Sequence, residues 1–184
     1  MEELKNKTIK RIKKNKKKLG EKLNVKITLD GNKAKLEGEE LNKFIARQVL
    51  RAIDRNFKLS EAILLKEEDY SLQDIPIKEY TTRKDLSNVK SRIIGREAKT
   101  IQLLNELSEC YKTLHYKVVS ILEPYENMKE TINAIKKLIQ GSDHSKVYKY
   151  LEKERAKLKN KPRDVGLKKS FKKKLEKIKE EENK

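Results

Sequence analysis

The chain has 184 residues, of which 35% are hydrophobic and 41% are charged, and its formal net charge is +18. This length fits one large domain or two small ones. The single cysteine, Cys110, excludes a disulfide framework and a thiolate metal cluster. No stretch is apolar enough for a signal peptide or a membrane span, so we expect a soluble, cytoplasmic protein without membrane contact.

The positive charge is concentrated at the two ends of the chain. Residues 1–22 contain ten Lys and Arg against three Asp and Glu, and residues 152–184 contain fourteen against seven. Basic ends around a nearly balanced centre indicate a folded module whose ends contact a polyanion. General Lys/Glu enrichment is the alternative, but it predicts matching Glu residues that the ends lack.

The first third of the chain predicts a hairpin followed by helices. Strands at 25–29 and 33–37 flank an Asp-Gly turn, a strong hairpin signal. Apolar residues at helical spacing predict a helix over 39–56, whose other face carries Lys43, Arg47, Arg51 and Arg55, and a short helix follows from Ser60 to Leu65. The lysine-rich segment Ile12–Lys16 precedes the hairpin and is a candidate loop between two helices.

The middle of the chain predicts a complete β-α-turn-α-β-β-α series. Residues 70–80 are extended, a helix starts after Thr81–Asp85 and ends at Gly95, and a second helix runs from about Ala98 to Ser108. Two strands (111–115 and 117–122) and a long helix (126–140) complete it. A further helix starts after Gly141, and Leu167, Phe171, Leu175 and Ile178 predict a basic amphipathic helix in the tail.

The segment Ser91–Ile101, S-R-I-I-G-R-E-A-K-T-I, carries the most informative motif. A glycine turn that leads into a helix directs unpaired N–H groups toward one point, where they favour phosphate. A turn of this kind between two helices is typical of the KH-domain loop, which clamps about four nucleotides of single-stranded RNA. The expected second glycine is Ala98. If Ala98 opens the second helix with a negative φ, alanine costs little there.

Three segments together resemble a known family: R-Q-V-L-R-A-I-D-R-N-F at 47–57, R-I-I-G-R-E-A-K-T at 92–100, and L-I-Q-G-S-D-H-S-K-V-Y at 138–148. They resemble the archaeal and eukaryotic double-KH assembly factors of the small ribosomal subunit. The resemblance implies a divergent first KH domain for partner contacts and a second that holds rRNA near its 3′ end. It also implies two partners, the endonuclease that matures that end and, in archaea, the α subunit of translation initiation factor two. The chain departs from the family pattern at Ser91 and Ala98 and in its basic tail.

The fold prediction is therefore α+β, with two type I KH domains and a basic helical tail. Residues 1–66 form a shortened, divergent KH domain, residues 67–158 form a KH domain with a C-terminal helix extension, and residues 159–184 form the tail. The predicted RNA-binding residues are Arg92, Ile93, Ile94, Gly95, Arg96, Glu97, Ala98, Lys99, Thr100 and Lys146. Bases are expected to lie across the adjacent apolar groove.

The sequence lacks the residue patterns that metal binding or catalysis needs. His115 and His144 have no second His or Cys at ligand spacing, so we expect no metal or cofactor. The carboxylates form no acid–base constellation, which argues against an enzyme. Two alternatives to specific RNA binding remain open. One is a protein-interaction adaptor with degenerate KH folds, favoured by Ser91 and Ala98, and the other is nonspecific binding of duplex DNA through the basic helices.

Overall fold

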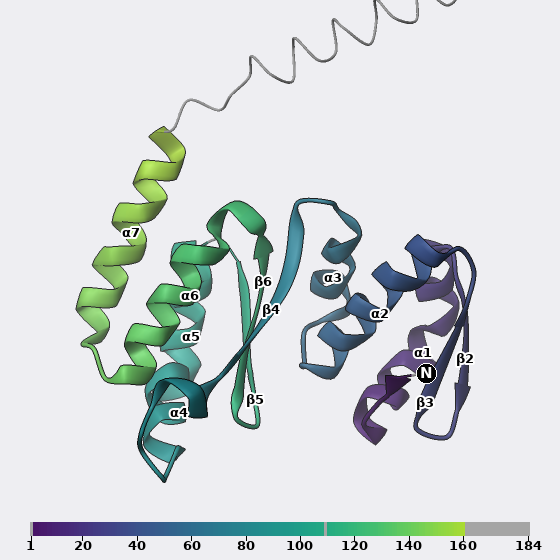
Figure 1. The fold of residues 1–184 in the computed structure, drawn as a ribbon, viewed down its shortest axis with the longest axis horizontal. Coiled ribbons are helices and arrows are strands. Elements are labelled where there is room, and N and C mark those ends of the chain that lie inside the picture. Colours follow the sequence, from purple (N-terminus) through teal and green to yellow (C-terminus); the bar gives the residue numbers. More distant parts are fainter. Residues whose placement is uncertain (1, 109, 161–184) are drawn as a thin grey trace, which may run out of the picture.

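The computed structural model describes residues 2–108 and 110–160, which form two units, each built on a three-stranded antiparallel sheet (Figure 1). The first unit contains residues up to Lys66, and the second begins at Tyr70. None of the described helices is long and apolar enough to span a membrane. Most of the predicted basic tail, residues 161–184, lies outside the described residues.

The first unit has its strands in the order β1-β3-β2. Its elements are β1 (Glu2–Glu3), α1 (Asn6–Leu23), β2 (Lys26–Asp30), β3 (Lys33–Glu37), α2 (Glu40–Asp54), α3 (Leu59–Ala62) and a 3-10 turn (Ile63–Lys66). The hairpin prediction is confirmed, with Asp30 paired to Lys33 across the turn. The N-terminal strand β1 has only two residues.

The prediction of a loop at Ile12–Lys16 is wrong. Helix α1 runs through this segment without a break, as one helix of 18 residues. Lysine is a good helix former, and the segment contains no Gly or Pro that would end a helix. Ile12, Leu19 and Leu23 are almost fully buried along one side of α1, and this packing holds the helix in place.

The second unit has its strands in the order β4-β6-β5, the same order as in the first unit. Its elements are β4 (Tyr70–Pro76), a 3-10 turn (Ile77–Tyr80), α4 (Ser87–Ile94), a 3-10 turn (Arg96–Ala98), α5 (Lys99–Ser108), β5 (Tyr111–His115), β6 (Val118–Pro124), α6 (Tyr125–Gln140) and α7 (His144–Asn160). The predicted β-α-turn-α-β-β-α series is confirmed. Helix α7 packs on α5 and α6 through buried Val147 and Leu151.

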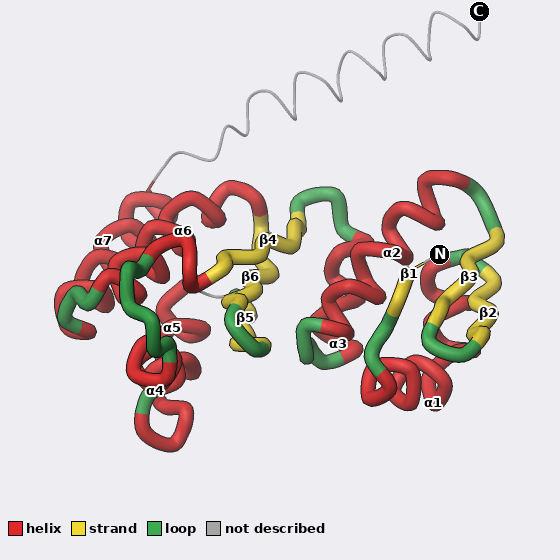
Figure 2. Tube along the Cα trace, turned by 60° about the horizontal axis from the view of Figure 1, so that its bottom comes forward, coloured by secondary structure: helices red, strands yellow, loops and turns green. Residues whose placement is uncertain are grey.

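The sheet of the second unit is buried on both faces. Val119 and Ile121 of the central strand β6 point into the core of the second unit, whereas Leu122 belongs to the core of the first. This alternation follows from the period of two in a strand. The first unit therefore covers the sheet face that α4, α5 and α6 leave open (Figures 1 and 2).

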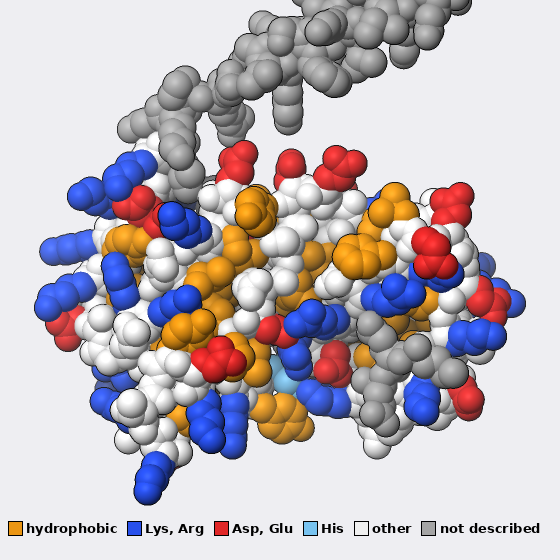
Figure 3. Space-filling view, in the orientation of Figure 1, with side chains coloured by type: hydrophobic (Ala, Val, Ile, Leu, Met, Phe, Trp, Pro, Cys, Tyr) orange, Lys and Arg blue, Asp and Glu red, His pale blue; other side chains and the backbone are white. Residues whose placement is uncertain are grey.

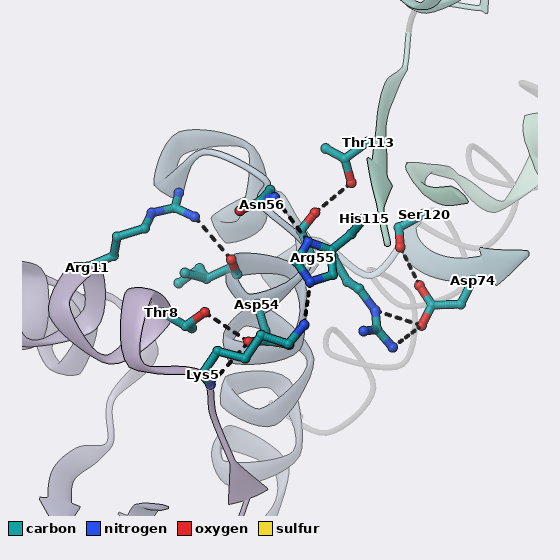
Figure 4. Close-up of polar contacts among 11 residues, drawn as sticks. Lys5, Thr8, Arg11, Asp54, Arg55, Asn56, Asp74, Thr113, His115 and Ser120 are labelled. Atoms are coloured by element: carbon teal, nitrogen blue, oxygen red, sulfur yellow. Dashed lines mark hydrogen bonds and ion pairs between the residues drawn. The ribbon is translucent and has the colours of Figure 1, made fainter. Parts of the chain in front are cut away.

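Polar contacts fix the two units together (Figure 4). Asp74 of β4 accepts hydrogen bonds from Arg51 at 2.8 Å and from Nη2 of Arg55 at 2.9 Å, and Ser120 donates to its other oxygen at 2.5 Å. Burial raises the pKa of Asp74, but these hydrogen bonds outweigh burial and hold its pKa below the usual value. Two arginines of the predicted basic stripe on α2 are therefore used inside the molecule. Thr113 adds a hydrogen bond to the Arg55 carbonyl, at 2.7 Å.

His115 lies at the other end of this contact (Figure 4). Its Nε2 contacts the Lys5 ammonium, which also lies 3.4 Å from Asp54, and its Nδ1 lies 3.0 Å from Asn56 Nδ2. Burial and the neighbouring Lys5 charge lower the pKa of His115, so the ring is neutral at pH 7. The contact of His115 with Lys5 and Asn56 therefore involves an uncharged imidazole.

Candidate nucleic-acid interface

The loop between α4 and α5 depends on Gly95. The Gly95 N–H donates to the Ser91 carbonyl at 2.8 Å and ends α4, and the residue then adopts φ 76° and ψ 171°. A Cβ at this position would lie 2.1 Å from Thr100 Oγ1 and 2.7 Å from the Thr100 nitrogen. Glycine is thus required both for its backbone angles and for space.

Glu97 and Ala98 continue the loop in the left-handed region, with φ of 54° and 60°. Ala98 therefore lacks the negative φ at which alanine would cost little, and α5 begins one residue later than expected, at Lys99. Each left-handed L-residue costs about 1–2 kcal/mol. The loop therefore holds the backbone in a shape that glycine, the residue typical of the motif here, would adopt at lower cost.

This shape leaves donors unpaired at the N-terminus of α5. The Ala98 N–H donates to Gly95 and the Lys99 N–H donates to Arg96, whereas the N–H groups of Arg96 and Glu97 have no acceptor among the described residues. Neighbouring N–H groups at a helix start favour an anion, since the helix dipole adds positive potential there. The loop has the geometry of a phosphate site.

The charged side chains of the loop are exposed to solvent. Arg96 is exposed, and Lys99 lies 2.9 Å from Glu97 with more than 70% of each side chain accessible. Such an exposed pair is weak and can exchange partners. Lys and Arg side chains gather over the lower part of the second unit, around α4 (Figure 3). A shallow depression of about 420 Å³ lies beside the loop, lined by Asn88, Ser91, Arg92, Gly95, Arg96, Thr100 and His144.

Arg92 connects this depression to the turn between α6 and α7. One guanidinium nitrogen donates to the Ser142 carbonyl at 2.6 Å, and His144 Nε2 donates to the Arg92 carbonyl at 2.9 Å. The predicted cluster G-S-D-H-S-K therefore meets the predicted loop in space, through residues about 50 positions apart. Arg92, one of the predicted RNA-binding residues, therefore joins the end of α4 to the turn between α6 and α7.

Comparisons with known proteins agree with this geometry. Residues 71–156 match the model of the eukaryotic type KH domain (KH-domain type I). The crystal structure of Dim2p from Pyrococcus horikoshii is 30% identical, with a TM-score of 0.69 over 76% of this chain and 87% of Dim2p. The chain belongs to the Dim2p family of KH-domain proteins.

One further relative and a second structure of P. horikoshii Dim2p support this assignment. A KH domain-containing protein of Methanocaldococcus jannaschii is 32% identical over 126 residues, which are 68% of this chain but only 56% of that relative. Dim2p of P. horikoshii in a complex with a/eIF2α and rRNA is 27% identical, with a TM-score of 0.76 over 85% of this chain and 93% of that one. The resemblance found in the sequence is confirmed.

Among the remaining predicted site residues of this Dim2p relative, some are buried and others are exposed to solvent. Ile93 is fully buried and supports the loop from the core, so its side chain cannot touch RNA. Ile94 is 37% exposed and lines a second depression of about 460 Å³ on the other side of α4, together with Lys84, Asp85, Leu86, Ser87, Lys90, Ser91 and Lys117. Lys146 is exposed on α7, 3.2 Å from Asp143.

Sequence reasoning missed Asn88 and did not assign His144 to this site. Asn88 lies one helical turn before Arg92 and seven residues before Gly95, so the helical period could have placed it on the loop side of α4. His144 reaches the site because α7 packs on α5 and α6, which brings its first residue to the end of α4. No group of three or more His, Cys, Asp or Glu side chains within the described ranges could hold a metal ion.

A buried polar cluster supports the far end of α5. The Lys112 ammonium donates to the Leu104 carbonyl at 2.9 Å and lies 2.7 Å from Cys110 Sγ. Burial raises the pKa of the Cys110 thiol to about 11, so it stays protonated. Burial also raises the pKa of Glu123, which accepts a hydrogen bond from Thr131. Cys110 is a buried packing residue in the core of the second unit.

Proposed function

We propose that this protein binds single-stranded RNA through the loop at 95–98, without catalysing a reaction. The observation that carries the proposal is the pair of unpaired N–H groups of Arg96 and Glu97, presented by a left-handed backbone at the start of α5. Arg96 is exposed, and the exposed pair of Lys99 with Glu97 can exchange partners, so both cations can neutralise neighbouring phosphates; Lys146 lies exposed on α7. Phosphate contacts of this kind fix register, and base edges in the depressions beside α4 supply sequence preference.

We propose that residues 67–158 form this KH domain and its helix extension, and that residues 1–66 form a divergent KH domain. The shared strand order of the two sheets supports the second statement. The single helix α1 in place of two helices and a loop means that the first unit has no clamp of its own. Residues 159–184 are the proposed basic tail.

The proposed RNA is rRNA of the small ribosomal subunit near its 3′ end, bound during assembly. The family assignment supports this proposal, as does the complex of P. horikoshii Dim2p with a/eIF2α and rRNA. The proposed protein partners are the endonuclease that matures the rRNA 3′ end and the α subunit of translation initiation factor two.

The test is a charge reversal of the two exposed cations of the loop, Arg96→Glu with Lys99→Glu. We expect at least about tenfold weaker binding to a single-stranded oligonucleotide of the small-subunit rRNA 3′ end, because two phosphate contacts are lost. Lys26→Glu with Lys33→Glu, on the β2–β3 hairpin, changes the net charge equally and should bind like the parent. Parent-like affinity of the loop variant would overturn the proposal. Substitution of Gly95 is less useful, since any Cβ there collides with Thr100.

A protein-interaction adaptor is the second candidate, and one observation favours it. The Arg92 guanidinium is already bound to Ser142, so one of the predicted RNA-binding side chains is engaged within the molecule. Nuclease treatment of a pull-down distinguishes the two functions. An adaptor keeps its protein partners, whereas partners bridged by RNA are lost.

A further inference from the structure

The exposed surface of helix α1 carries almost only positive charge. Eight of its 18 residues are exposed lysines, namely Lys7, Lys10, Lys13, Lys14, Lys16, Lys17, Lys18 and Lys22. Glu21 is the only acidic residue of the helix. None of the eight lysines forms an ion pair with another described residue. We call these eight residues the lysine face.

The arrangement of the lysines follows from the helical period. At 100° per residue, six of them fall on the side opposite the buried Ile12 and Leu19, and Lys16 and Lys22 flank them. The helix is roughly 27 Å long at 1.5 Å per residue, so the face is an extended, rigid strip of positive charge.

Folding does not explain this composition. Lysines three and four positions apart repel one another, at about 0.2–0.5 kcal/mol for each pair. The first turn of α1 has no acidic residue and no side-chain cap, so its positive charge also opposes the helix dipole. Helix α7, by contrast, pairs Lys157 with Glu154 and Lys146 with Asp143. The unpaired charge of α1 therefore points to a ligand outside the chain.

We propose that the lysine face binds the phosphate backbone of double-stranded RNA, at a second site separate from the loop at 95–98. This inference deepens the proposed RNA-binding function. The apolar side of α1 is fully used in the core, so nothing is left to insert into a membrane. The face contains no exposed aromatic or aliphatic side chain, which a protein interface or a stacking site for single strands requires. Charge alone, spaced along a rigid strip, suits a duplex backbone.

The position of α1 allows one RNA to reach both sites. Figure 2 shows α1 along the lower edge of the first unit and α4 at the lower edge of the second. A rRNA segment with a helical stem next to a single strand could place its stem on the lysine face and its strand on the loop. The divergent unit would then contribute affinity without sequence preference.

The test compares two triple variants of the full chain. Lys10→Gln, Lys14→Gln and Lys17→Gln remove three charges from the lysine face, and Lys26→Gln, Lys33→Gln and Lys35→Gln remove three exposed charges from the β2–β3 hairpin. The probe is a blunt RNA duplex of arbitrary sequence, titrated at several salt concentrations. The first variant should bind at least about tenfold more weakly in 0.1 M salt, and its slope of log K against log salt should fall by about 2–3.

The hairpin variant should retain the parental affinity and slope. Equal losses in both variants would mean that net charge alone matters, and no loss in the first variant would mean that the lysine face is not used; either result overturns the inference. Single-stranded RNA, measured in parallel, separates this inference from the proposed function. The lysine-face variant should still bind the single strand, whereas the Arg96 and Lys99 variant should lose the single strand and keep the duplex.

Discussion

Replacing Ala98 by glycine should stabilise the protein, although alanine-to-glycine changes usually destabilise. Ala98 has φ 60°, a conformation that costs an L-residue about 1–2 kcal/mol and that glycine adopts freely. Glycine adds about 0.4–1 kcal/mol of conformational entropy to the unfolded chain, which opposes the gain. The net expectation is an increase in the free energy of unfolding of about 0.5–1 kcal/mol.

Urea unfolding measures this change, and thermal unfolding should show a Tm higher by about 1–4 °C for a protein of this size. Ala156→Gly is the matched control, since Ala156 is exposed within helix α7, where glycine should cost about 1 kcal/mol. Equal destabilisation by both substitutions would refute a left-handed Ala98.

The same variant should bind single-stranded RNA more tightly. Loss of the methyl group lets a phosphate approach the backbone at the position where the KH motif typically has glycine. The dependence of affinity on salt should stay as in the parent, because no charge changes. Weaker binding would show that the methyl group of Ala98 contacts RNA favourably.

Three further predictions address the loop and the contact between the units. Gly95→Ala should cost more than about 2 kcal/mol in urea unfolding, because the new Cβ collides with neighbouring atoms, whereas Gly31→Ala, also at positive φ but in open space, should cost about 1 kcal/mol. Asp74→Asn should cost about 2 kcal/mol, since it removes the partner of two arginines, and Asp30→Asn on the exposed hairpin should stay within about 0.5 kcal/mol of the parent. The lowered pKa of His115 means that the unfolded chain binds a proton first as pH falls, so stability should decrease from pH 7 to pH 5. His115→Gln should make that decrease smaller, and an unchanged pH profile would contradict the neutral-ring contact.

Local signals predicted the second unit well. The helix before Gly95, the β-branched strand at 118–124 and the C-cap at Gly141 each depend on residues within a few positions of one another. The hairpin at Asp30 and Gly31 was predictable for the same reason. The predicted and observed ends of these helices and strands agree to within a few residues, because the local signals mark where each element begins and ends.

Features that depend on distant contacts were not predictable. The Arg92 side chain donates a hydrogen bond to the Ser142 carbonyl, 50 residues away. Thr113 donates one to the Arg55 carbonyl, 58 residues away. The sign of φ at Ala98 depends on the path that joins α4 to α5, because alanine alone favours the right-handed region. The sequence did not predict that α1 is one unbroken helix, because the lysines that suggested a loop are also good helix formers.

A comparison of the two units supports the proposed role of the loop at 95–98. Both have the same strand order, yet the first replaces the two helices and the loop by α1 alone. A glycine loop is therefore not needed to build this sheet and its helices. The second unit nevertheless keeps Glu97 and Ala98 left-handed, at a cost of a few kcal/mol, in an exposed segment that the core does not require. A strained backbone with unpaired N–H groups persists where an interaction with a ligand can offset its cost. The first unit has no such loop between two helices, and its helix α1 carries the lysine face.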